Sequence, residues 1–316
     1  MTLQQLEYIV AMDIHHSFTA AAQACFVTQP TLSTMIQKLE TELGVYLFDR
    51  SKQPVMPTEL GRAVITQARR VLEEAEQLHF LVKEVQDEIE GDLTIGVIPT
   101  LAPYLLPRFL PGLSEAYPHT RFRIAELTTA QIFEQLKNRT IDVGLLAGPV
   151  LESGLVESPV FVEEFMAYAP LVSSLMAKEE LMPEDIDTSH LLLLEEGHCL
   201  RSQVINLCAL QQQQQQKGTF FYEAGSLETL RRLVETYPGI TILPALALQD
   251  MDDKKRPFVR TFAPPAPVRE IVLATHLSFH RKQLLQIVKD AIVDSLPDEV
   301  RYQRKLYRVL NIETPA

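Results

Sequence analysis

The spacing of apolar residues changes at Gly91, and this change divides the chain into two parts with different folds. Before Gly91 the apolar residues recur every three or four positions, as they do in helices. After Gly91, short apolar and β-branched runs alternate with helical segments, which is typical of an α/β sheet. The 316 residues are enough for two or three domains that each bury a core.

The composition of the chain limits its compartment and its partners. Three cysteines are too few for a disulfide scaffold, and the N-terminus MTLQQLEYIV lacks the features of a signal peptide, so we expect a cytoplasmic protein with reduced thiols. No apolar run approaches the roughly 20 residues that cross a bilayer, so we expect no membrane partner. The formal net charge of −12 disfavours general affinity for polyanions, but it leaves room for a small DNA-reading module that uses polar contacts.

The first 60 residues predict three short helices joined by tight turns. Ser17 is the expected cap of the second helix and Thr28 that of the third, which has Pro30 in its first turn and ends at Gly44. Small alanines in the second helix permit close packing, as in a helix-turn-helix whose third segment enters a major groove. The apolar residues of the third helix share one face: Leu32, Ile36, Leu39 and Leu43.

The polar face of the third helix is the candidate DNA-reading surface. The turn-rich segment LFDRSKQPVMPTELG that follows predicts a small β-wing, with Thr58 as the cap of the next helix. Residues 1–62 carry a formal net charge of −2, so specific binding would need dimerisation and well-placed polar contacts. The alternative is an ordinary three-helix bundle with a polar outer face. The predicted DNA contacts are Gln29, Pro30, Thr31, Ser33, Thr34, Gln37 and Arg50.

A heptad-like pattern over residues 63–90 predicts a long linker helix. Its apolar residues alternate spacings of four and three, the pattern of a coiled-coil seam with charged flanks. The alternative is a helix buried inside one domain. The seam comprises Val64, Ala68, Val71, Ala75, Leu78, Val82, Val85 and Ile89, and we expect Val71, Ala75, Leu78, Val82 and Val85 to pair two chains.

Residues 91–300 predict an α/β domain of two lobes, followed by a tail over residues 301–316. Strands at DLTIGVI, RFRIAEL and IDVGLLAG alternate with two helices, so we expect βαβαβ order and a mostly parallel sheet. Later signals predict strands at HLLLLEE, TFFYEAG and GITILPAL and a capped helix from Ser226. A late strand, EIVLATH, and the helix after it are expected to return to the first sheet.

The lobes and their cleft follow from this order of elements. We expect lobe I over about 91–163 and 270–300, and lobe II over about 164–269. Ligands of open α/β sheets bind beyond the carboxyl ends of strands. Thr100, Thr129 and the Gly197-His198-Cys199 corner fall at that position.

A helix is predicted over residues 199–210, with Cys199 at its start and Cys208 near its end. A thiol reacts as thiolate, and the helix N-terminus, His198 and Arg201 would each lower the pKa of Cys199. The alternative is that both cysteines are small core residues, since periodicity puts Cys208 among apolar neighbours such as Val204.

The chain resembles a known family over nearly its whole length. The segment FTAAAQACFVTQPTLSTMIQKLETELGVYLFDR resembles the helix-turn-helix of LysR-type transcriptional regulators. The segments IGVIPTLAPYLLP, LLLLEEGHCLRSQVINLC and SLETLRRLV resemble the peroxide-sensing members of that family. The resemblance implies a mixed fold: an all-α-type winged helix-turn-helix domain, a linker helix, and a two-lobed α/β regulatory domain like periplasmic solute-binding proteins.

The resemblance also implies roles and partners. Cys199 would be the peroxide-reacting thiol and Cys208 its resolving partner, with no cofactor and no metal. The expected partners are hydrogen peroxide, double-stranded promoter DNA, RNA polymerase and further copies of the chain in a dimer of dimers. The glutamine tract at residues 211–216 departs from the family. The implied peroxide pocket is lined by Thr100, Thr129, Gly197, His198 and Arg269.

The spacing of the two cysteines has a mechanical consequence. Nine residues of helix span ~13.5 Å, whereas a disulfide needs Cα atoms within roughly 4.4–6.8 Å. A bond between Cys199 and Cys208 therefore requires this helix to unwind, which would make the bond a two-state switch.

Other functions remain open at this stage. A thiol peroxidase would use the same two cysteines, and a metabolite-sensing regulator would bind a small organic effector in the cleft. A metal sensor using His198, Cys199 and Cys208 lacks a fourth nearby ligand. The chain has no GxSxG elbow, P-loop or HExxH helix, so hydrolase and NTPase functions have no support.

Overall fold

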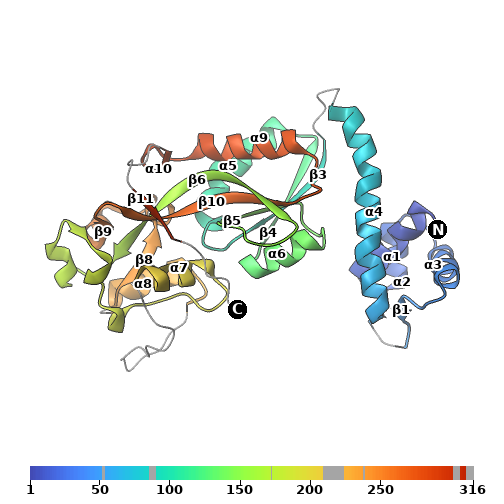
Figure 1. The fold of residues 1–316 in the computed structure, drawn as a ribbon, viewed down its shortest axis with the longest axis horizontal. Helices are drawn as coiled ribbons and strands as arrows, with labels where there is room; N and C mark the ends of the chain where they lie inside the picture. Colours follow the sequence, from blue (N-terminus) through green and yellow to red (C-terminus); the bar gives the residue numbers. More distant parts are fainter. Residues whose placement is uncertain are drawn as a thin grey trace. The chain divides into compact units, whose positions relative to one another are not determined.

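The computed structural model comprises two compact units, Met1–Glu88 and Ile89–Ala316, and each is described by itself (Figure 1). The described residues are 1–51, 54–84, 90–171, 173–208, 224–237, 239–301 and 307–310.

The N-terminal unit is a winged helix-turn-helix. Helices α1 (Leu3–His15), α2 (Phe18–Ala24) and α3 (Gln29–Leu43) precede the wing strands β1 (Phe48–Asp49) and β2 (Met56–Pro57), and α4 (Glu59–Glu84) follows. The predicted caps are confirmed, because Ser17 accepts from the amide of Ala20, and Thr28 from that of Thr31. Gly44 ends α3 in the left-handed conformation, with φ of 72°.

The core of this unit forms where α1, α2 and α3 meet. The apolar face of α3 is buried at Leu32, Ile36 and Leu39, together with Ile9 and Met12 of α1. Leu43 does not complete this face. It is 39% exposed, because α3 ends at the next residue.

The first part of the predicted seam packs inside the N-terminal unit. α4 begins at Glu59 rather than at residue 63, and Ala68 is buried in the core of its own unit. Val64 and Val71 pack partly against that core as well, so this part of the seam is used within the unit. Ala75 is half-buried, the side chains of Leu78 and Val82 are not described, and Val85 and Ile89 lie outside the described residues.

The C-terminal unit begins with the predicted βαβαβ order, which is confirmed. β3 (Gly91–Val97) pairs in parallel with both β4 (Thr120–Glu126) and β5 (Val143–Ala147). Helices α5 (Ala102–Ala116) and α6 (Thr129–Lys137) make the crossovers. The carboxyl ends of β3, β4 and β5 therefore meet at one edge of the sheet.

Two long strands connect the halves of this unit. β6 (Leu155–Tyr168) and β10 (Ala266–His276) run antiparallel to each other, and β10 also runs antiparallel to β5. The last residues of β6 pair with β8 (Thr241–Pro244) and β9 (Val259–Phe262), and β7 (Glu180–Leu181) pairs with β9. The late strand thus returns to the first sheet as predicted, but its direction makes the sheet mixed rather than mostly parallel.

The remaining elements complete the C-terminal unit. They are the helices α7 (Cys199–Leu207), α8 (Leu227–Thr236), α9 (Lys282–Ser295) and α10 (Asp298–Arg301), the strand β11 (Tyr307–Val309), and the short 3-10 helices η1 (Ser174–Ala177), η2 (Pro183–Asp185), η3 (Thr188–His190), η4 (Ala245–Leu248) and η5 (Asp253–Phe258). The predicted strand at HLLLLEE is wrong, because Leu191 and Leu194 form only isolated bridges, to Ile240 and Ala224. The strand predicted at TFFYEAG lies mostly outside the described residues.

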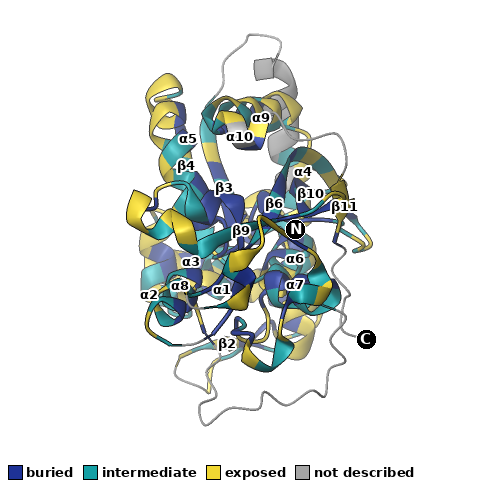
Figure 2. Cartoon of the chain, turned by 90° about the vertical axis from the view of Figure 1, so that its left-hand side faces the viewer, coloured by how far each residue is buried: buried dark blue, intermediate teal, exposed yellow. Residues whose placement is uncertain are grey.

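Two apolar cores lie in the C-terminal unit. We call the core around β3, β5, α5, α6 and α9 the first core, and the core around β8, α7 and α8 the second core. β10 is buried along almost its whole length, and its residues Ile271 to Ala274 belong to the first core (Figure 2). Among the described residues, no helix is long and apolar enough to cross a membrane.

A close approach between the wing and α4 yields a test of this fold. A Cβ added to Gly61 would lie 2.0 Å from the carbonyl oxygen of Leu47, a backbone atom that cannot move alone. We expect Gly61→Ala to lower the free energy of unfolding by at least about 1–3 kcal/mol, as overpacking does. Gly112→Ala in α5 is the matched control, because a Cβ there meets nothing within 4 Å. Equal thermal midpoints for the two variants would contradict this packing.

Candidate functional site

Cys199 lies where the first core meets the second. Its side chain, 6% exposed, belongs to the first core, whereas Leu200, Val204 and Leu207 of the same helix belong to the second core. α7 begins at Cys199 and ends at Leu207, three residues earlier than predicted, with Cys208 as its C-cap. The thiol is therefore held in one core by a helix that is packed into the other.

Groups from the edge of the first sheet surround the thiol. Thr128 caps α6 after β4, and the next residue, Thr129, lies against Cys199. Thr129 Oγ1 is buried, and no described atom meets it in normal hydrogen-bond geometry. The amide groups of Ala147, at the end of β5, and Leu200 also face the sulfur. A buried hydroxyl without a regular partner is thus presented to the thiol.

Arg269 lies fully buried at the centre of the site. Its Nε donates to Glu163 Oε2 at 2.8 Å, Nη1 donates to Thr100 Oγ1 at 3.0 Å, and Nη2 donates to the carbonyl of Thr100 at 3.3 Å. Glu163 is equally buried, and its Oε1 accepts from the amide of Leu246 at 2.7 Å. Arg269 and Glu163 are register partners across β10 and β6, so the sheet itself brings this ion pair together.

The surroundings of Cys199 shift the pKa of its thiol in opposite directions. Burial raises the pKa of this thiol above its ordinary value, and the guanidinium of Arg269 and the hydroxyl of Thr129 lower it only in part. The helix N-terminus contributes the expected lowering through the amide of Leu200, but burial outweighs it. Arg201 donates instead to the carbonyl of Leu194 at 2.7 Å, and His198 Nε2 lies 3.8 Å from Glu195 Oε1.

The corner before α7 is shaped by Gly197. This residue has φ of 94°, a backbone conformation that residues other than glycine rarely adopt. Its Cα faces α6, since an added Cβ would lie 3.8 Å from the methyl group of Thr128. His198 is buried beside it and makes no side-chain cap for α7. The turn thus sets the position at which Cys199 enters the first core.

Cys208 lies at the other end of α7. It packs partly against the second core, and burial raises the pKa of its thiol to about 11. Its amide donates to the carbonyl of Val204 at 3.1 Å, which continues the helix to this residue. The structure thus keeps the two cysteines apart as free thiols.

A buried glutamine fastens the C-terminal segment to α7. Gln203 is fully buried, and its Nε2 donates to the carbonyl of Leu310 at 3.1 Å. Leu310 lies in the second core, and its amide donates to the carbonyl of Val268 at 2.8 Å. Neither Gln203 nor Glu163 was selected from the sequence, because their partners lie about a hundred positions away in the chain.

The predicted DNA-reading face of α3 is accessible. Ser33 is half-buried, and the other predicted positions on this helix are exposed: Gln29, Pro30, Thr31, Thr34 and Gln37. Arg50 is already engaged within the unit, since its Nη2 lies 2.9 Å from Glu40 Oε2 and its guanidinium lies over the ring of Phe18. Glu40, which the sequence did not single out, is buried and accepts from the amide of Leu47 at 2.8 Å.

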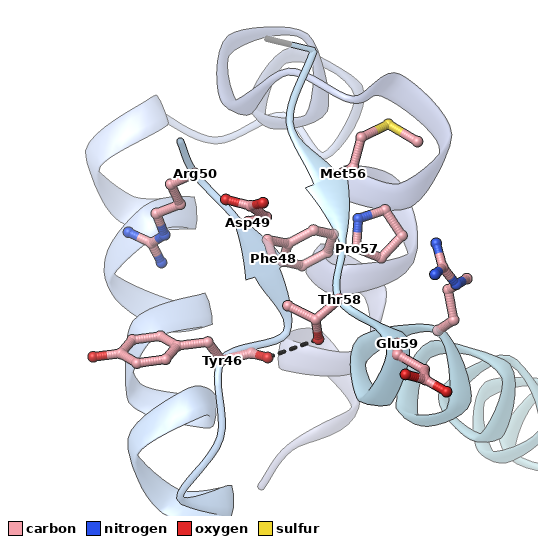
Figure 3. A pocket seen from close by; sticks show the side chains of 9 residues that line it. Tyr46, Phe48, Asp49, Arg50, Met56, Pro57, Thr58 and Glu59 are labelled. Carbon is pink, nitrogen blue, oxygen red and sulfur yellow. Dashed lines mark hydrogen bonds between the residues drawn. The ribbon is translucent and has the colours of Figure 1, made fainter. Parts of the chain in front are cut away.

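A hollow of about 680 Å³ lies beside the wing. Strands β1 and β2 and the start of α4 form its walls, and Tyr46, Arg50 and Arg62 contribute side chains (Figure 3). Thr58 donates to the carbonyl of Tyr46 at 2.9 Å and caps α4 by accepting from Gly61, which confirms its predicted capping role. The wing is thus fixed to the helix that follows it.

Comparison with known families identifies the two units. Residues 3–62 match the bacterial regulatory helix-turn-helix proteins of the lysR family, and residues 86–297 match the LysR substrate binding domain. The chain belongs to the LysR family of transcriptional regulators. The N-terminal unit is accordingly the DNA-binding part of a LysR-family protein.

Three relatives illustrate this membership. The DNA-binding transcriptional dual regulator OxyR of Escherichia coli K12 is 40% identical over 249 residues, 78% of this chain and 80% of that protein. A full-length OxyR cysteine variant from Pseudomonas aeruginosa is 34% identical, with a TM-score of 0.80, and covers 95% of this chain and 100% of its own. An OxyR cysteine variant from Corynebacterium glutamicum, solved with hydrogen peroxide bound, is 30% identical, with a TM-score of 0.60 and 93% coverage of each chain.

In the described part of this LysR-family chain, no group of three His, Cys, Asp or Glu side chains is arranged to hold a metal ion.

The raised pKa of Cys199 predicts how its oxidation depends on pH. Only the thiolate attacks peroxide, and its fraction rises about tenfold per pH unit below the pKa. We expect the oxidation rate of a Cys208→Ser, Cys25→Ser protein, followed with a sulfenic acid probe, to rise steadily from about pH 6 to about pH 9. A plateau that begins below about pH 7 would mean that the thiolate is already formed at neutral pH.

The two threonines predict different consequences on losing their hydroxyls. Thr129→Val removes a hydroxyl without a regular partner, so the thermal midpoint should be unchanged or higher, while peroxide oxidation slows by about tenfold. Thr100→Val, the matched comparison, also removes an acceptor of Arg269 and should destabilise the fold by about 1–3 kcal/mol. If the Thr129→Val protein is oxidised at the wild-type rate, Thr129 does not assist the reaction of Cys199 with peroxide.

Proposed function

We propose that this protein is a transcriptional regulator that senses hydrogen peroxide by oxidation of Cys199 and formation of a disulfide with Cys208. The observation that carries the proposal is a buried thiol beside Arg269 and Thr129, at the start of a helix packed into a different core. Similarity to an OxyR protein that holds hydrogen peroxide supports the choice of oxidant.

The first chemical step takes place at the Cys199 sulfur. The thiolate attacks one oxygen of hydrogen peroxide, the O–O bond breaks, and hydroxide leaves and takes up a proton to become water. Cys199 is then a sulfenic acid. The Thr129 hydroxyl is available to hold the peroxide in line with the sulfur, and Arg269 favours the anionic thiol before attack.

The second step needs movement of α7. Its nine residues hold the thiols ~13.5 Å apart along the axis, well beyond disulfide distance. Burial raises the pKa of Cys208 to about 11, so unwinding, which frees this thiol from the second core, increases its thiolate fraction. Cys208 then attacks the Cys199 sulfur, a disulfide forms, and water leaves.

Unwinding changes the surface of the C-terminal unit. Val204 and Leu207 would leave the second core, and Gln203 would lose its bond to Leu310. The C-terminal segment would then keep the pairing of β11 with β10 but lose its link to α7. Oxidation of one sulfur thereby changes the surface that is available for contacts between subunits.

The full regulator acts as an assembly on DNA. We infer a dimer of dimers paired through α4 beyond Val71, bound to double-stranded promoter DNA in the cytoplasm and working with RNA polymerase. In this role the disulfide is a signal rather than a catalytic turnover, so the protein is a regulator and not a thiol peroxidase.

Arg269 argues against the alternative of an organic effector. A carboxylate effector that relied on Arg269 would find this guanidinium already paired with Glu163 and donating to Thr100. A small neutral molecule such as hydrogen peroxide does not need an unpaired cation.

The cysteine variants test this function. Cys199→Ser should lose both oxidation and the transcriptional response, because a hydroxyl is a far weaker nucleophile. Cys208→Ser should form the sulfenic acid but no lasting bond, and Cys25→Ser is the control that should respond normally. Mass spectrometry after micromolar peroxide, paired with transcription in vitro, measures these outcomes. Absence of a Cys199–Cys208 bond in the wild-type protein would defeat the proposal.

The polar face of α3 provides a separate test of DNA binding. Ser33→Ala or Thr34→Ala should weaken specific operator binding without changing the oligomer, because each removes one base-reading hydroxyl. The expected loss is about 1–3 kcal/mol if the contact is to a base edge. Operator affinity equal to wild type in both variants, at one fixed salt concentration, would rule out this face.

A further inference from the structure

Phe26 is the most exposed large apolar side chain of the described residues. It is 97% exposed and lies in the turn between α2 and α3. Its φ is 54°, in the left-handed region that is unusual for a bulky residue. The aromatic ring is thus exposed to water, and its residue has a backbone conformation that asparagine or glycine adopts more easily.

The position of Phe26 in the fold limits what the ring can meet. It comes two residues before Thr28, the N-cap of α3. In a helix-turn-helix the N-terminal residues of the second helix read base edges, while the first helix crosses the backbone. The turn between them therefore lies close to the duplex. The residues that follow the ring, Thr28 to Thr31, are all exposed as well, so the ring continues this surface.

The charge of the N-terminal unit makes an apolar base contact valuable. Residues 1–62 contain four basic residues, and Arg50 is paired with Glu40. Few phosphates can be neutralised by so few cations, which increases the importance of contacts made in the groove. The methyl group of thymine is the apolar feature of the major groove, and phenylalanine is among the side chains that contact it.

We propose that Phe26 is a specificity-determining residue that packs against a thymine methyl group at the edge of the operator. This inference rests on the DNA-binding part of the proposed function and is independent of the peroxide switch. Phe26 would thus select thymine at a position next to the bases that α3 reads.

The test combines a side-chain change with a change in the DNA. The operator is a duplex selected from a random pool by the wild-type protein, prepared with thymine or with uracil, which lacks the methyl group. Phe26→Asn suits the left-handed backbone, so its thermal midpoint should equal or exceed that of wild type. Leu277→Asn, an exposed residue of the C-terminal unit, is the control.

We expect Phe26→Asn to bind the thymine operator about tenfold more weakly than wild type at fixed salt, and Leu277→Asn to bind as wild type does. Replacing thymine by uracil at the contacted position should weaken wild type by a similar factor and leave Phe26→Asn unchanged. Equal affinities of wild type and Phe26→Asn, or an equal uracil effect in both, would overturn the proposal. Failure of wild type to select any sequence would instead overturn the DNA-binding function itself.

Discussion

The buried ion pair between Arg269 and Glu163 lies where the two long strands pass from one core to the other. Because the two residues are register partners on β10 and β6, any shift of one strand would leave a charge unpaired in the interior. Removing one partner of such a pair costs about 3–5 kcal/mol. The same guanidinium holds Thr100 and favours the anionic form of Cys199. One interaction thus fixes the register of β6 and β10, holds Thr100 after β3 and places a guanidinium near the thiol.

The second constraint is the packing of α7 into two cores at once. Cys199 is anchored in the first core, and the rest of the helix in the second. In the reduced state burial raises the pKa of both thiols above that of an exposed thiol. Less thiolate is then present, so non-specific oxidation is slower. Once Cys199 is a sulfenic acid, the disulfide can form only at the expense of the helix. Gln203 extends this coupling to the C-terminal segment through Leu310.

Local features of this chain were predictable, and long-range ones were not. The caps at Ser17 and Thr28 and the apolar face of α3 depend on residues three or four positions apart. The convergence of Thr129 with Cys199 was suggested by strand order and family resemblance. The pairing of Arg269 with Glu163 depends on the register of strands 106 positions apart, which no local pattern encodes. The raised pKa of Cys199 was missed for the same reason, since burial is decided by the packed fold.

Amide exchange of α7 in reduced and oxidised protein tests the central claim most directly. If the disulfide requires unwinding, residues 200–207 should lose protection after peroxide treatment, because their amides are protected by the hydrogen bonds of α7. Cys208→Ser treated in the same way should keep its protection, since its sulfenic acid has no partner to pull the helix open. Equal protection of residues 200–207 in the reduced protein and in a protein shown to contain the Cys199–Cys208 bond would contradict the account.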